Sequence, residues 1–321
     1  MIKKLKKELV GAAVSLMISA VALTSATYAW YVANNTVEAT TTTISATTNG
    51  FILQIADAEQ GAQRGGNEMS LAATTIGGKI TPSSTNDLKE WWVCRGWNDA
   101  GMVTSYEQLS FDTSGGAKAG QYTDISGTTH FAYIKSEYVL YTINQSGIAD
   151  VYLDASEGKP IEVSIDNGKT ASSTTIPDSM RIAITTQKLK DDGKTPDAAK
   201  PETLRVVYAP TEVSGSGNDS QALDGRWTYV NGTKPVEVTY KHIFDTTYTD
   251  QEGANWGITK TGGDYFVTPG TEAIATDVGY NGIMLRVYIW MEGTDADCVN
   301  NAAAEDEATY SVTLKLAGVA S

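Results

Sequence analysis

Hydrophobic and polar residues alternate along most of the chain with a period of two, the pattern of a strand that buries one face and exposes the other. The last such segment, residues 309–316, reads TYSVTLKL and places Tyr, Val and Leu on one face and Thr, Ser and Lys on the other. We predict strands at residues 51–56, 137–143, 149–155, 161–166, 180–186, 204–209, 236–241, 283–290 and 309–316.

Turn signals separate many of these segments. Asn-Gly and Asp-Gly pairs favour positive φ and two-residue hairpin turns, and therefore antiparallel neighbours. Such pairs occur at residues 49–50, 167–168, 192–193, 231–232 and 281–282. Two polar stretches, residues 191–202 and 211–225, are predicted to be exposed loops, because strand-like sequence resumes after each without a change of composition.

Helical signals are sparse. Residues 84–97 open with two candidate capping residues, Thr85 and Asn86, and predict one short helix, and residues 300–308 predict one or two further turns. The remaining pattern predicts an all-β fold, an antiparallel β-sandwich with long loop insertions. Because the composition does not change along the chain, one large sandwich is favoured over two domains.

The first residues have the organisation of an export signal. Four lysines lie within the first seven residues, and residues 9–23 are apolar or small. A helix of that length spans about 22 Å, less than a hydrocarbon core of roughly 30 Å. Small residues at Thr27 and Ala29 then predict cleavage between Ala29 and Trp30. The alternative retains residues 9–33 as a membrane anchor, with Trp30 and Tyr31 at the interface.

A threonine-rich stretch follows the predicted cleavage site. Residues 30–48 read WYVANNTVEATTTTISATT, and Thr, Val and Ile favour extended backbone over helix. The sequence therefore divides into a signal peptide at residues 1–29, an N-terminal extended segment at residues 30–48 and a β-sandwich domain at residues 49–321.

The net charge of the chain excludes one class of binding partner. The chain has 24 Lys and Arg against 38 Asp and Glu, a formal net charge of −14. A surface of that sign repels the phosphates of nucleic acids, so we predict no nucleic-acid partner.

Residues that usually carry catalysis are scarce. His130 and His242 are the only histidines, and neither the HExxH pattern of a zinc protease nor the GxSxG pattern of a serine hydrolase occurs. We therefore predict that the protein is not an enzyme and needs no cofactor.

Three tryptophans gather in the segment EWWVCRGW, residues 90–97. Exposed indole rings of Trp91, Trp92 and Trp97 would stack on sugar rings or on a partner surface. The competing interpretation buries these residues at one end of the sandwich.

Two further groups leave alternatives open. Cys94 and Cys298 are too far apart in sequence for a redox CxxC pair. They either form a disulfide outside the cell or are two small buried apolar residues.

Glu292, Asp295 and Asp297 offer carboxylate oxygens at the spacing of a weak calcium site, but the glycine and the late glutamate of an EF-hand are missing. A solvated acidic turn is therefore the favoured interpretation.

Two distant pieces of sequence resemble one family. TYAWYVANN, residues 27–35, resembles the junction cut by SipW-type signal peptidases. LRVYIWMEGTDADC, residues 285–298, followed by a closing strand, resembles the C-terminal end of secreted Gram-positive proteins with that type of signal. On these residues the chain resembles the TasA and camelysin family of biofilm-matrix and surface-fibre proteins.

The resemblance implies a jelly-roll-like sandwich whose freed extended segment, residues 30–48, pairs with a neighbouring subunit. It predicts a head-to-tail homopolymer at the cell surface or in the extracellular matrix, with signal peptidase as a partner during export and glycans or other matrix proteins as further partners. In one alternative, residues 30–48 form the first strand of their own sandwich. In another, the protein is a monomeric or membrane-tethered adhesin that binds carbohydrate through Trp91, Trp92 and Trp97.

Overall fold

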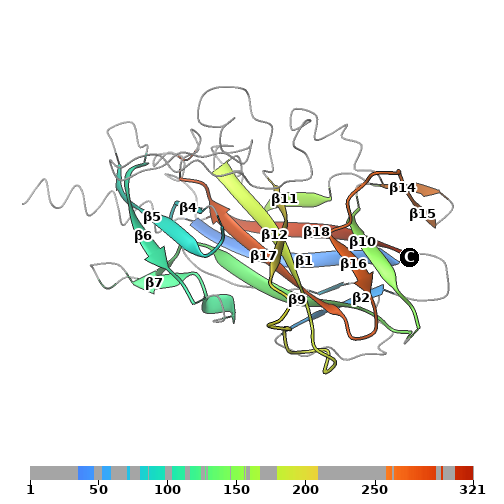
Figure 1. Ribbon diagram of the computed structural model, residues 1–321. Helices are drawn as coiled ribbons and strands as arrows, with labels where there is room; N and C mark the ends of the chain where they lie inside the picture. The colour runs from blue at the N-terminus through green and yellow to red at the C-terminus, as the bar shows by residue number, and fades with distance from the viewer. Residues whose placement is uncertain are drawn as a thin grey trace, which may run out of the picture.

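The structure is a computed structural model in which two β-sheets pack face to face (Figure 1). It describes residues 35–46, 53–58, 71–72, 80–85, 87–97, 103–112, 116–123, 127, 129–144, 146–154, 156, 160–166, 179–208, 258–261, 264–293, 298 and 308–320. Within these ranges no helix has the length and apolarity needed to cross a membrane.

The first sheet, sheet A, contains both the first and the last strand. Its path runs β16–β10–β18–β1–β3, and β11 pairs with the first half of β18, on the side where β10 pairs with the second half. The strands are β1 (Asn35–Ala46), β3 (Leu71–Ala72), β10 (Ala149–Leu153), β11 (Ile161–Asp166), β16 (Ala275–Val278) and β18 (Ala308–Ala320).

The second sheet, sheet B, is antiparallel throughout, with the order β13–β12–β17–β9–β2. Its strands are β2 (Leu53–Asp57), β9 (Ile134–Thr142), β12 (Met180–Lys188), β13 (Thr203–Tyr208) and β17 (Ile283–Met291). All nine residues of β17 are buried, because it lies in the middle of sheet B and both faces of the sheet are covered there.

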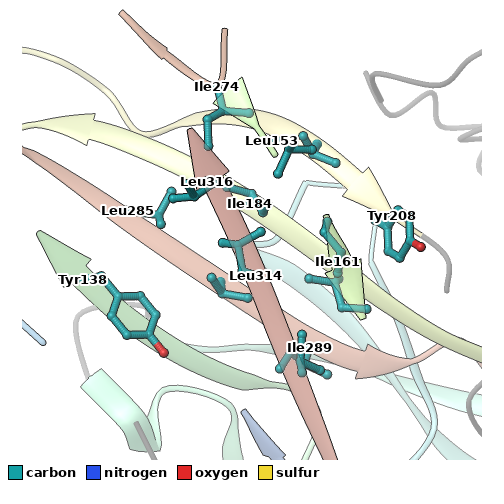
Figure 2. Packing of buried hydrophobic residues seen from close by; sticks show 14 of the residues in the cluster. Tyr138, Leu153, Ile161, Ile184, Tyr208, Ile274, Leu285, Ile289, Leu314 and Leu316 are labelled. Atoms are coloured by element: carbon teal, nitrogen blue, oxygen red, sulfur yellow. The ribbon is translucent and has the colours of Figure 1, made fainter. Parts of the chain in front are cut away.

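The main core lies between the two sheets. Leu314 and Leu316 of β18 pack against residues from the middle strands of sheet B, including Leu285 and Ile289 of β17 (Figure 2). The two faces meet closely at Gly318, where a Cβ atom would come within 2.7 Å of the Leu53 side chain. Alternation along the strands therefore produces this core, as the sequence predicts.

Smaller sheets cover the sandwich. β4 (Ser83–Thr85), β5 (Glu90–Trp97) and β6 (Val103–Ser110) form a three-stranded sheet that packs on the outer face of sheet B. The remaining elements are two hairpins and one 3₁₀ turn: β7 (Gln121–Thr123) with β8 (Thr129–Phe131), β14 (Ile258–Thr261) with β15 (Asp264–Val267), and η1 (Gly116–Lys118).

The prediction of a helix at residues 84–97 is wrong. Thr85 accepts a hydrogen bond from the Leu88 N–H at 3.0 Å, but Leu88 has a φ of 61°, so the contact closes a turn between β4 and β5 instead of starting a helix. The aromatic and β-branched residues that follow suit a strand. Residues 300–307 and the expected strand at 236–241 lie outside the described residues. The all-β sandwich and the other predicted strands are confirmed.

One predicted turn has a different role from the expected one. Asn281 and Gly282 join β16 of sheet A to β17 of sheet B, so this turn links the two sheets and is not a hairpin. Gly282 has a φ of 82°, and a Cβ there would lie 2.7 Å from the Leu140 carbonyl oxygen. Only glycine meets both conditions without strain.

Candidate functional site

The candidate site is the N-terminal strand β1 and the edge of β18 on which it lies. β1 pairs with β18 in parallel from Asn35 opposite Ala308 to Ala46 opposite Gly318. On its other side, among the described residues, β1 pairs with the two residues of β3, at Thr42 and Thr43. Within that part of the chain, the backbone of β1 is therefore paired along one edge from end to end and along the other edge at one place.

The pairing contains one irregularity, within the run of four threonines. Ala39 lies opposite Val312 and Thr42 opposite Leu314, so β1 advances three residues while β18 advances two. This is the count of a β-bulge, which adds one residue to one strand and increases the local twist. The register on either side of the bulge remains regular.

Several β18 residues that pair with β1 have side chains in the main core of the sandwich. Val312, Leu314 and Leu316 are at most 4 % exposed and belong to the main core. The register places Ala39, Thr42 and Ile44 of β1 directly beside them. On its other edge β18 is held by β10 and β11, so β18 does not depend on β1 alone for its pairing.

The structure thus places residues 35–46 of the predicted extended segment in their own sandwich. This is the intramolecular alternative stated for residues 30–48, in which β1 pairs with β18 of the same chain. The predicted cleavage site between Ala29 and Trp30 lies outside the described residues.

The tryptophan segment is built into the interior. Trp91 is 0 % exposed, stacks on Tyr133 with ring centroids 4.2 Å apart and meets Trp290 edge-on at 5.6 Å. Trp92 is half-buried and packs against the same cluster, and Trp97 pairs with Val103 through its backbone. Because Trp91 has no exposed surface, it cannot stack on a sugar in this conformation.

The disulfide, one of the two alternatives for the cysteines, is not formed in the structure. Cys94 and Cys298 are both buried thiols. Cys298 is 1 % exposed and packs in the main core, which is the second of the two interpretations offered for the cysteines.

Glu292, one residue of the weak calcium candidate, does not lie in the solvated acidic turn that the sequence favours. Glu292 is 1 % exposed, and its carboxylate accepts hydrogen bonds from the Ser84 hydroxyl and from Trp290 Nε1, the latter at 3.0 Å. Glu292 therefore links β4 to the end of β17. Asp295 and Asp297 lie outside the described residues, within which no cluster of three or more metal-ligating side chains occurs.

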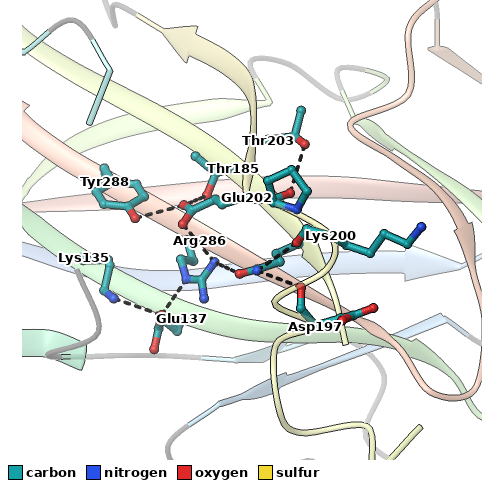
Figure 3. Close-up of polar contacts among 11 residues, drawn as sticks. Lys135, Glu137, Thr185, Asp197, Lys200, Glu202, Thr203, Arg286 and Tyr288 are labelled. Carbon is teal, nitrogen blue, oxygen red and sulfur yellow. Dashed lines mark hydrogen bonds and ion pairs between the residues drawn. The ribbon is translucent and has the colours of Figure 1, made fainter. Parts of the chain in front are cut away.

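A polar network that the sequence analysis missed crosses the outer face of sheet B (Figure 3). Glu137 binds Lys135 at 3.0 Å and Arg286 at 2.6 Å, and Arg286 also binds Glu202 at 3.1 Å. Lys135 is only 1 % exposed, so this cation is buried, and its partner Glu137 is 21 % exposed. The polar strand residues of the network occupy alternate positions of strands that the sequence predicts. The alternation gives no indication that other elements cover the face of the sheet on which these side chains lie.

The network controls the protonation of its members. Burial alone would raise the pKa of Glu137, but the Arg286 hydrogen bond and the Lys135 charge outweigh it and lower that pKa below its usual value. Burial and the charge of Glu202 raise the pKa of Tyr288, whose hydroxyl stays protonated and donates to Glu202 at 3.0 Å. The arrangement is a paired structural network with two cations and two carboxylates.

Comparisons with known proteins found no family model, no curated protein and no solved structure that matches the chain.

Proposed function

We propose that this protein is a secreted structural protein of the bacterial surface or extracellular matrix, and that its copies assemble into fibres by exchanging β1. The observation that carries the proposal is the pairing of β1, which is bound to β18 along one edge and to two residues of β3 along the other. The basic and apolar start of the chain supports export, and the resemblance to fibre-forming Gram-positive proteins supports the role.

Strand exchange requires no new interface. The β1 strand of a second copy can occupy the same edge of β18 with the same register, so each hydrogen bond of the monomer has an equivalent in the assembly. If each copy donates β1 to the next, the contact is heterologous and repeats without closing, which produces a filament. Protein concentration then decides between the closed monomer and the fibre.

The chain after β1 limits the geometry of the exchange. Six residues separate Ala46 at the end of β1 from Leu53 at the start of β2. Fully extended, they span at most about 20 to 22 Å. Neighbouring bodies must therefore be in contact, and the fibre is expected to be compact rather than a string of separated beads.

The experiment uses cysteines at register partners. Glu38 lies opposite Ser311, and adjacent strands are about 4.8 Å apart, a distance that a disulfide can bridge. We expect fibres grown from an equal mixture of E38C and S311C chains to give disulfide-linked dimers on mild oxidation. The native cysteines are buried and should not compete.

Two controls make this experiment decisive. A mixture of E38C and K315C chains should not cross-link, because residues 311 and 315 are about 13 Å apart along the strand. The double variant E38C/S311C, oxidised as a monomer, should be locked and unable to polymerise until it is reduced. Two results would rule out exchange of β1. One is fibre formation by the oxidised E38C/S311C double variant. The other is the absence of intermolecular cross-links in fibres grown from the mixture of E38C and S311C chains.

A further inference from the structure

A small cavity lies at the margin of the sandwich, where the ends of β12 and β13 in sheet B approach β16 of sheet A. Its volume is about 180 Å³. Three cationic and three hydroxyl side chains contribute to its wall: Lys188, Lys200, Arg205, Thr186, Thr203 and Thr276. The cavity is separate from β1 but adjoins the polar network around Arg286, because Gln187 contributes to its wall and accepts a hydrogen bond from Arg286 Nη1 at 2.9 Å.

The charge of this cavity is opposite to that of the protein. The chain carries a net charge of −14, yet three of its 24 cationic residues converge here. Some other described cations are paired with carboxylates, for example Arg95 with Glu107 and Lys315 with Glu162. Within the described part of the chain, no carboxylate forms an ion pair with any of the three cavity cations. No described carboxylate therefore neutralises these charges.

Two hydrogen bonds order residues in the wall of the cavity. Arg205 donates from Nε to the Thr186 hydroxyl at 2.8 Å, which restricts the orientation of the guanidinium plane. Gln187 donates from Nε2 to the Lys200 carbonyl at 3.0 Å and thereby anchors the loop. The Lys200 side chain extends away from the Arg286 network (Figure 3).

We propose that this cavity binds a phosphate group. Its volume is below the roughly 300 to 1,000 Å³ of pockets for drug-sized ligands, which fits a small anion or one group of a larger molecule. A guanidinium and two ammonium groups match the charge and the several oxygens of a phosphate better than those of a single carboxylate. Threonine hydroxyls supply further donors to the same oxygens.

Titration of the full-length protein with inorganic phosphate, followed by NMR at low salt, tests the proposal. We expect saturable shifts at Thr186, Thr203 and Arg205. The variant K188Q/K200Q should weaken binding about tenfold, because it removes two charge-assisted contacts and leaves the backbone pairing intact. The control K190Q/K194Q removes the same charge from the same loop outside the cavity and should change the affinity less than about twofold.

A second probe identifies the source of the phosphate. Binding of a glycerol phosphodiester as tight as that of inorganic phosphate would indicate a polymer with a phosphodiester backbone, whereas preference for inorganic phosphate would indicate a free dianion. Absence of saturable binding of both probes, or equal weakening by K188Q/K200Q and K190Q/K194Q, would overturn the proposal. The outcome is independent of whether β1 is exchanged.

Discussion

At the scale of single residues, the interior of this protein depends on a few large side chains with defined partners. Trp91 stacks on Tyr133 and meets Trp290 edge-on, and this cluster joins the three-stranded sheet to the outer face of sheet B. A buried indole contributes both its area and the geometry of its ring contacts. Trp92, its neighbour in sequence, is only half-buried because successive side chains of a strand point to opposite faces.

We therefore expect W91A to lower the free energy of unfolding by about 3 to 5 kcal/mol, since it leaves a cavity that the neighbouring strands fill only in part. W92A should cost less, about 1 to 2 kcal/mol, since its ring is partly solvated. Chemical denaturation followed by circular dichroism measures both. Equal losses for the two variants would contradict the burial described for Trp91.

A second residue-scale prediction concerns pH. The pKa of Glu137 is lowered in the folded state by Arg286 and Lys135, in spite of its burial. A lowered folded pKa means that the stabilisation is complete above the unfolded value, about 4.5, and is lost as the pH falls through the folded value. We expect E137Q to be less stable than the parent protein near pH 6 and the difference to shrink towards pH 3. Urea unfolding across this pH range measures it, and a difference independent of pH would contradict the account.

At the scale of elements, the bulge in β1 offers a direct test of its register. Because residues 40–43 are all threonine, deletion of any one of them gives the same chain. The deletion removes the extra residue and keeps Ala39 opposite Val312 and Ile44 opposite Leu316. We expect a change in the free energy of unfolding of no more than about 1 kcal/mol.

The matched control for this deletion is removal of Ser45. It forces either Ile44 or Ala46 out of its position beside β18, because a slip of one residue turns a strand over. The loss of stability should therefore exceed that of the threonine deletion in the same denaturation assay. If the two deletions cost the same, the register of β1 against β18 is not the one described.

The same elements indicate how much of the fold could be predicted. Alternation identified β9, β12, β17 and β18, because each buries a face in the main core and the pattern is local. Thr85 predicts a helix start near Leu88 because a threonine cap suits a helix and a turn equally, and the burial of Trp91 in the packed structure favours the turn and strand. The parallel pairing of β1 with β18 has no local signal, since it joins residues from opposite ends of the sequence.

At the scale of the whole molecule, charge opposes the proposed assembly. The full chain has a net charge of −14, and cleavage after Ala29 would make each copy more negative because it removes four lysines and one glutamate. Such copies repel one another over distances comparable to the Debye length, about 10 Å at 0.1 M salt. We expect fibre growth, followed by light scattering, to accelerate several-fold between 20 and 200 mM NaCl at fixed protein concentration. The oxidised E38C/S311C monomer serves as the control and should show no growth at either salt concentration. Growth that slows with added salt would indicate that attraction between opposite charges, and not backbone pairing, drives association.

The pairing of the first strand with the last also sets the order in which the molecule can be completed. Asn35 and its partner Ala308 are 273 positions apart. A chain synthesised from its N-terminus must produce nearly all of its residues before β1 meets the strand on which it lies. During that interval, the chain's own β18 is not available, whereas a fibre built by strand exchange would present an open β18 edge at its end. Nascent molecules would then join an existing fibre end more readily than mature ones, and growth would be coupled to secretion.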